Sequence, residues 1–204
     1  EYIENSEKVC FEGNNYSEEW HAEAEKRGLP NVRTTPVSLD AYVTDKSKHL
    51  FENNNVLTHV ELEARHEIEL EKYIKKVQIE ARIMGEMATS HILPAAIKYQ
   101  NELIQNIKGL KELGLKEETY ATQKQIVEKI SAHVNKMADL VENMIEARKK
   151  ANVIKNTREM AIAYCDTVKD KYFDEIRYHA DKLELLVSDD YWMLPKYREM
   201  LFLR

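Results

Sequence analysis

The stretch that decides the fold is THVELEARHEIELEKYIKKVQIEARIMGEMATSHIL, residues 58–93. It opens with Thr58 and Glu61 at the spacing of a capping box, in which each side chain accepts a hydrogen bond from a free N–H group at a helix start. No proline follows before Pro94. Apolar residues recur at helical spacing along this stretch, namely Ala64, Ile68, Ile74, Val77, Ala81, Met84, Ala88 and Ile92. The pattern predicts a long amphipathic helix.

Beyond Pro94 the same rhythm continues through Leu110 and stops at Gly114. We therefore expect residues 58–113 to form one helix of roughly 80 Å, at about 1.5 Å per residue. Because proline lacks the N–H group that would bond to residue 90, the helix should be kinked near Pro94.

Two more helical patterns follow, over residues 116–151 and from Thr157 to Val187. The connections are only a few residues long, which is typical of antiparallel neighbours. The predicted fold is therefore all-α: a long kinked helix and two antiparallel helices in a three-helix bundle. Residues 58–76 of the long helix should project beyond its partners.

The flanking segments predict smaller elements. Ser17 before two acidic residues, with Gly28 at the exit, predicts a short helix over about 17–27. Another should begin at Thr35 or Ser38 and end at Leu50 or Phe51, with a break near Thr44. The predicted organisation is short helices and loops at 1–57, the bundle at 58–188, and an irregular aromatic docking tail at 189–204.

Composition narrows the function. The net charge is −6, and the lysines alternate with glutamates instead of forming a basic stripe, which argues against a nucleic-acid partner. No window approaches the roughly 18 apolar residues that cross a bilayer, so we expect a soluble, cytoplasmic protein with no membrane partner. Cys10 and Cys165 lack metal or redox spacing and should be reduced thiols packed as small hydrophobes.

Candidate chemical sites are few. Glu63 and His66 have the Glu-x-x-His spacing of di-iron bundles, but that site needs a second copy and further glutamates, so a solvated ion-pair face is the preferred interpretation. The seven histidines show no zinc spacing, and no phosphate loop or nucleophile elbow occurs. We therefore predict no catalytic, cofactor-binding or metal-binding residue in this chain.

Several segments together resemble a known family. They are GNNYSEEW at 13–20, KRGLPN at 26–31 with TTP at 34–36, EARHEIELEKY at 63–73, ILPAAIKY at 92–99 and YWMLPKYREMLF at 191–202. In this order they resemble the C-terminal region of bacterial type III glutamine synthetases. Residues 1–11 resemble the end of the catalytic domain's last helix, and the chain begins without methionine, so we expect a fragment of a larger protein.

The resemblance implies a parent glutamate–ammonia ligase that uses ATP and Mg²⁺ or Mn²⁺ in a site shared between subunits of a double-ringed dodecamer. The family builds that site from an N-terminal β-grasp domain and an antiparallel barrel, and no matching motif occurs here, so the fragment alone should be inactive. The implied role is a non-catalytic helical domain for subunit packing or regulation, with the catalytic domain and neighbouring subunits as partners. The alternative is an independent helical interaction module. The candidate interface residues are Ile68, Tyr191, Trp192, Leu194, Leu201 and Phe202.

Overall fold

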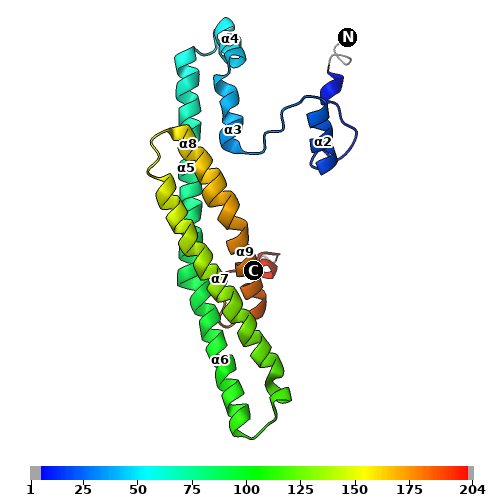
Figure 1. Ribbon diagram of the computed structural model, residues 1–204, viewed down its shortest axis with the longest axis vertical. Coiled ribbons are helices and arrows are strands. Elements are labelled where there is room, and N and C mark those ends of the chain that lie inside the picture. The colour runs from blue at the N-terminus through cyan, green and yellow to red at the C-terminus, as the bar shows by residue number, and fades with distance from the viewer. Residues whose placement is uncertain (1–5, 202–204) are drawn as a thin grey trace. The chain divides into compact units, whose positions relative to one another are not determined.

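The computed structural model describes residues 6–201, and every regular element in that range is helical (Figure 1). The predicted all-α fold is thus confirmed. The chain divides into two compact units, Glu1–His66 and Glu67–Arg204, with the boundary inside a helix. The three-part organisation at 1–57, 58–188 and 189–204 remains a prediction.

The first unit is a series of short helices that begin at polar caps. Ser17 Oγ accepts a hydrogen bond from the Trp20 N–H group at 3.4 Å. Thr44 Oγ1 accepts one from the Ser47 N–H group at 3.2 Å, which places the predicted break. Gly28 follows the first of these helices with φ +72°, a left-handed conformation that favours glycine. The elements are η1 (Glu7–Val9), α2 (Glu18–Lys26), α3 (Thr35–Leu39), η2 (Asp40–Val43) and α4 (Asp45–Asn53). Of the predicted helix end at 1–11, residues 1–5 lie outside the described part.

The long helix is confirmed as 54 residues of continuous helix. It consists of α5 (His59–Met87), the π-helical segment η3 (Ala88–Ile92) and α6 (Leu93–Glu112). The capping box forms as predicted, because the Thr58 N–H group donates to Glu61 Oε2 at 2.8 Å and the Glu61 N–H group donates to Thr58 Oγ1 at 3.3 Å. The π segment ends two residues before Pro94, so the helix changes its hydrogen-bond register just where the proline lacks a donor.

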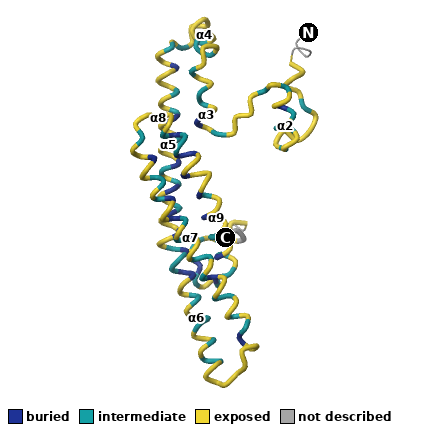
Figure 2. The backbone as a smooth tube through the Cα atoms, in the orientation of Figure 1, coloured by how far each residue is buried: buried dark blue, intermediate teal, exposed yellow. Residues whose placement is uncertain are grey.

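Two antiparallel helices complete the second unit (Figure 1). One is α7 (Ala121–Ala151), preceded by η4 (Glu117–Tyr120), and it packs against both α6 and α9. The other is α8 (Thr157–Ala163), the π-helical η5 (Tyr164–Lys169) and α9 (Asp170–Leu186). Figure 2 shows the buried positions where these helices face one another. Fully or nearly fully buried side chains include Val77, Ala81, Ile130, Met137, Val141, Met144, Val168, Ile176 and Leu183.

The structure corrects two details of the predicted long helix. Ala64 and Ile68 lie on its exposed side, and Leu70 is the buried residue of that turn. Leu70 shares one helix face with the buried Ile74 and Val77, whereas Ile68 lies on the opposite face. Residues 67–76 do not project freely. The turn after α7 and the start of α8 continue past the end of α7 and reach this level, where the Thr157 hydroxyl donates to Glu67 Oε1 at 3.1 Å.

The tail after α9 is fastened to the end of its own helix. Lys196 Nζ donates to the carbonyl oxygens of Glu184 and Val187 at 2.9 and 3.3 Å and pairs with Asp189 at 2.6 Å. Glu184 lies in the last turn of α9 and Val187 is its C-cap, and carbonyls at a helix C-terminus have no later N–H groups of the helix to satisfy them. The Lys196 ammonium also lies 5.9 Å from the Trp192 ring centroid. The tail then forms η6 (Tyr197–Leu201).

Candidate functional site

A polar network joins three segments of the bundle, namely α5, the turn after α7, and η5. The Tyr164 hydroxyl of η5 donates to Asn152 Oδ1 at 2.5 Å, and Gln78 Nε2 of α5 donates to the same Asn152 oxygen at 2.7 Å and to the Tyr164 hydroxyl at 2.9 Å. Tyr164 is completely buried. Gln78 is half-buried and Asn152 is exposed, and the buried Tyr164 hydroxyl has both as partners. The network thus fixes the register of α5 against the turn that follows α7.

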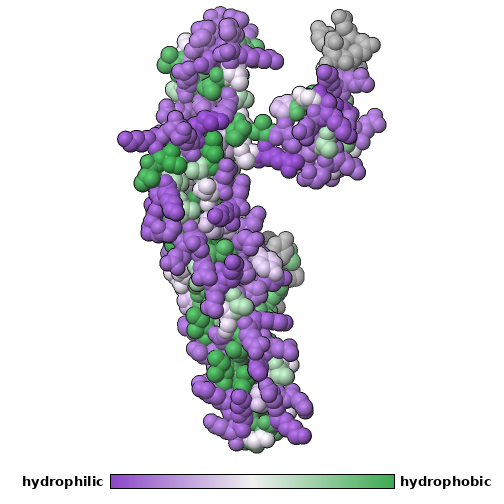
Figure 3. Space-filling model, viewed as in Figure 1, coloured by the Kyte–Doolittle hydropathy of each residue, from purple (hydrophilic) through white to green (hydrophobic). Residues whose placement is uncertain are grey.

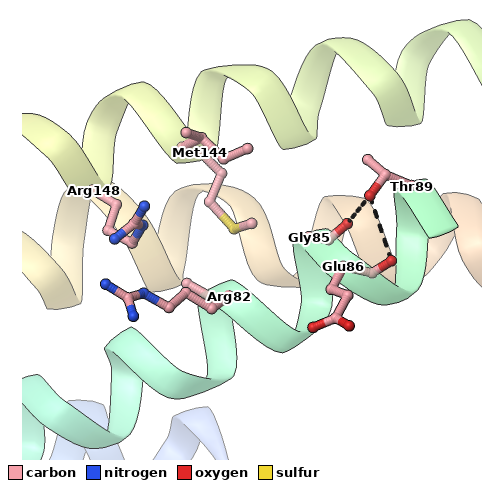
Figure 4. Close-up of a pocket in the computed structure, with 8 residues that line it drawn as sticks. Arg82, Gly85, Glu86, Thr89, Met144 and Arg148 are labelled. Atoms are coloured by element: carbon pink, nitrogen blue, oxygen red, sulfur yellow. Dashed lines mark hydrogen bonds between the residues drawn. The ribbon is translucent and has the colours of Figure 1, made fainter.

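A cleft opens between α5 and α7 immediately before the π segment (Figure 4). Its volume is about 220 Å³. Gly85 forms part of the wall and leaves space that a side chain would take, and the Thr89 hydroxyl turns back onto its own helix to donate to the Gly85 carbonyl at 2.9 Å. The cleft is lined by Ala81, Arg82, Gly85, Glu86, Thr89, Met144, Ile145 and Arg148. Sequence periodicity gave no signal for it, because it depends on which residues of α5 and α7 meet.

Two histidines from different helices meet beside the core of the second unit. His133 of α7 and His179 of α9 place their Nδ1 atoms 2.8 Å apart, so one ring donates the hydrogen bond and the other accepts it. Burial lowers the pKa of both imidazoles below the usual value, and the Lys182 ammonium adds to this for His133. The separation of 46 residues hid this pair from spacing arguments.

A cysteine, two aspartates and a tyrosine cluster at η5. Cys165 Sγ lies 3.7 Å from Asp170 Oδ2, and Asp166 completes a group whose ligand atoms could approach one cation. Burial raises the pKa of the Cys165 thiol and, with the nearby thiol, that of the Tyr73 phenol. Both groups are therefore protonated at neutral pH, and Cys165 is a buried thiol as expected, whereas Cys10 is exposed.

The Glu-x-x-His pair is engaged with other side chains. Glu63 Oε1 accepts a hydrogen bond from Lys48 Nζ at 2.7 Å, and His66 Nε2 lies 3.5 Å from Asp40 Oδ1. The lysine holds the pKa of Glu63 below its usual value. Glu63 thus belongs to an ion pair of the helix surface, and His66 lies beside a carboxylate of η2.

The candidate interface residues lie in different environments. Ile68 and Leu201 are 49% and 66% exposed. Tyr191 and Leu194 are half-buried, and Tyr191 lies with its ring centroid 5.9 Å from that of Tyr99. Trp192 is only 9% exposed, so its indole packs on this chain and is not a free docking surface. Phe202 lies outside the described residues.

Large apolar side chains on α5 form a second, exposed stripe. They are Ile68, Ile79, Ile83 and Met87, between 38% and 57% exposed. At about 100° per residue, these positions lie on the side of the helix opposite Leu70, Ile74, Val77 and Ala81. Figure 3 shows apolar patches interrupting the charged surface along the second unit. We call Ile68, Ile79, Ile83 and Met87 the outer stripe.

No helix within residues 6–201 is long and apolar enough to cross a membrane.

Comparison with known proteins shows the family to which the chain is related. A model of the glutamine synthetase C-terminal domain matches residues 1–111. The chain is 44% identical over 201 residues to a glutamine synthetase of Bacteroides fragilis (strain YCH46), covering 97% of this chain and 27% of the relative. It is 33% identical to a glutamine synthetase of Butyrivibrio fibrisolvens, covering 96% and 28%, and 30% identical to the type-3 glutamine synthetase of Dictyostelium discoideum, covering 97% and 27%. The chain thus spans little more than a quarter of these relatives.

Proposed function

Because this chain belongs to the glutamine synthetase C-terminal domain family, we propose that it is the non-catalytic helical domain of a type III glutamine synthetase. The parent protein would ligate ammonia to glutamate at the expense of ATP. In this proposal ATP and the divalent cation, Mg²⁺ or Mn²⁺, bind to the part of the protein outside these 204 residues. The helical domain serves subunit packing or regulation.

The outer stripe is the observation that carries a packing role. A surface helix of a globular protein has one apolar face and buries it against the core. Helix α5 has a second apolar face, on the side opposite the core. Burying a large aliphatic side chain completely contributes about 1.5–3 kcal/mol. Four such side chains, each about half exposed, would therefore contribute roughly 3–6 kcal/mol if another surface covered them. The rest of the same protein and its neighbouring subunits are the surfaces that we propose.

The test replaces Ile68 and, separately, Ile83 by Asp in the full-length parent enzyme. Asn101→Asp is the matched control, since Asn101 is exposed on α6 and its replacement adds the same charge. We would measure particle mass by light scattering and glutamine formation by the biosynthetic assay. Loss of the assembled particle would show that the outer stripe contacts a neighbouring subunit; an intact particle with lost activity would indicate the enzyme's own catalytic domain.

If both Asp variants assemble and react as the Asn101→Asp control does, the packing role is wrong.

The tail is tested in the same way with Leu201→Asp, because Leu201 is exposed and its replacement does not disturb the core. Trp192 is unsuitable for this purpose, since an Asp there would unfold the tail even without a partner. Loss of a metabolite response alone in these variants would favour the regulatory role.

A further inference from the structure

Two arginines converge in the cleft between α5 and α7. Arg82 extends from α5 and Arg148 from the last turn of α7, and Figure 4 shows both guanidinium groups at the same end of the cleft. Among the described residues, neither makes a side-chain hydrogen bond or an ion pair.

Three other arginines of this chain are paired. Arg27, Arg33 and Arg177 each hold a carboxylate oxygen, at 2.7, 3.4 and 2.6 Å. The chain has 36 acidic residues against 30 basic ones, so carboxylates are not scarce. Like charges brought together repel unless an opposite charge lies between them. The cleft therefore places two positive charges at one end, and the carboxylate of Glu86 lies at the other.

The geometry selects the kind of anion. A carboxylate pairs with one guanidinium group in a bidentate contact, and its single negative charge balances only one of the two positive charges of Arg82 and Arg148. A phosphoryl group has three free oxygens and a charge of about −1.5 to −2 at neutral pH, which matches two guanidinium groups. The rest of the cleft offers apolar surface from Met144 and Ile145, and Glu86 lies away from the arginines in Figure 4.

The size of the cleft agrees with a ligand larger than water. Its volume of about 220 Å³ is far above the roughly 10–15 Å³ that one water molecule requires. We propose that the Arg82–Arg148 cleft binds a small phosphate-bearing molecule. The phosphoryl group lies between the two guanidinium groups, and the uncharged remainder lies against Met144 and Ile145.

The experiment is isothermal titration of the 204-residue chain with inorganic phosphate and with phenyl phosphate, at constant ionic strength. Phenyl phosphate, which adds an apolar body, should bind more tightly than inorganic phosphate, with one site per chain. Arg82→Gln and Arg148→Gln should each weaken binding about tenfold or more, because each removes a charge-assisted hydrogen bond. Circular dichroism of each variant checks that the helices remain folded.

Lys149→Gln is the matched control. Lys149 follows Arg148 directly but points to Glu146, to which it donates at 2.6 Å, so its loss should change binding by less than about twofold. Equal weakening in Lys149→Gln would mean general charge attraction and would overturn the site. Absence of saturable binding in the unaltered chain would also overturn the site. If, in addition, Arg82→Gln and Arg148→Gln each dissociate the parent particle, the two arginines pair with a carboxylate of another subunit instead of a phosphate.

Discussion

Replacing Tyr164 by Phe tests whether the polar network holds α5, the turn after α7 and η5 together. The change removes only the hydroxyl, which donates to Asn152 Oδ1 at 2.5 Å and accepts from Gln78 Nε2 at 2.9 Å. Each hydrogen bond contributes about 0.5–1.5 kcal/mol net. Gln78 keeps its bond to Asn152, so neither partner is left wholly unsatisfied. The expected loss of unfolding free energy is therefore about 1–3 kcal/mol, the sum of two bonds.

The assay is urea and thermal unfolding of the 204-residue chain, followed by circular dichroism at the helical band. For a chain of this size, each kcal/mol should lower Tm by roughly 2–4 °C. Tyr178→Phe is the control, because Tyr178 is 53% exposed and its hydroxyl makes no hydrogen bond to the described residues. A Tyr164→Phe variant as stable as Tyr178→Phe would refute the reasoning. A double-mutant cycle with Gln78→Ala should show coupling of about 0.5 kcal/mol or more.

Three other measurements follow from local geometry. Gly109→Ala should stabilise the chain by about 0.5–1 kcal/mol, because Gly109 lies inside α6 with no atom in the way of a Cβ, whereas Gly114→Ala should destabilise it because φ is +77°; thermal unfolding decides both. Thr58→Ala should cost about 1 kcal/mol by removing one half of the capping box, and an unchanged Tm would contradict this. The lowered pKa values of His133 and His179 mean that the unfolded chain binds protons first, so stability is full above about pH 6.5 and falls as the pH drops below it. His133→Gln should lose less Tm than the unaltered chain between pH 7.5 and 5.5, and equal losses would exclude the pair as the cause.

Helix boundaries could be predicted because local chemistry decides them. Ser17 and the Thr58–Glu61 pair satisfy free N–H groups within three residues, so the signal lies in a few adjacent letters of the sequence. Gly28 and Gly114 end helices at positive φ for the same local reason. The antiparallel bundle followed from short connections.

The phase of the core and the site depended on contacts that sequence spacing does not encode. Ile68 fits the helical period, yet the structure buries Leu70, because the position of the α7–α8 turn decides which side of α5 is covered. The tail offered the same ambiguity, since Trp192 could be covered by this chain or by another. The Arg82–Arg148 cleft arises only when residues 66 positions apart are brought together by the packing of α5 on α7.

The fastening of the tail also gives the chain a built-in optical reporter. It contains two tryptophans, Trp20 in the first unit and Trp192 in the second. Trp192 is buried while the tail is docked, and Lys196 of the tail donates a hydrogen bond to a carbonyl at the end of α9. Loss of this contact would expose the indole to water and shift its emission to longer wavelength. A Trp20→Phe chain would therefore emit from Trp192 alone, and its fluorescence would follow undocking of the tail separately from the melting of the helices.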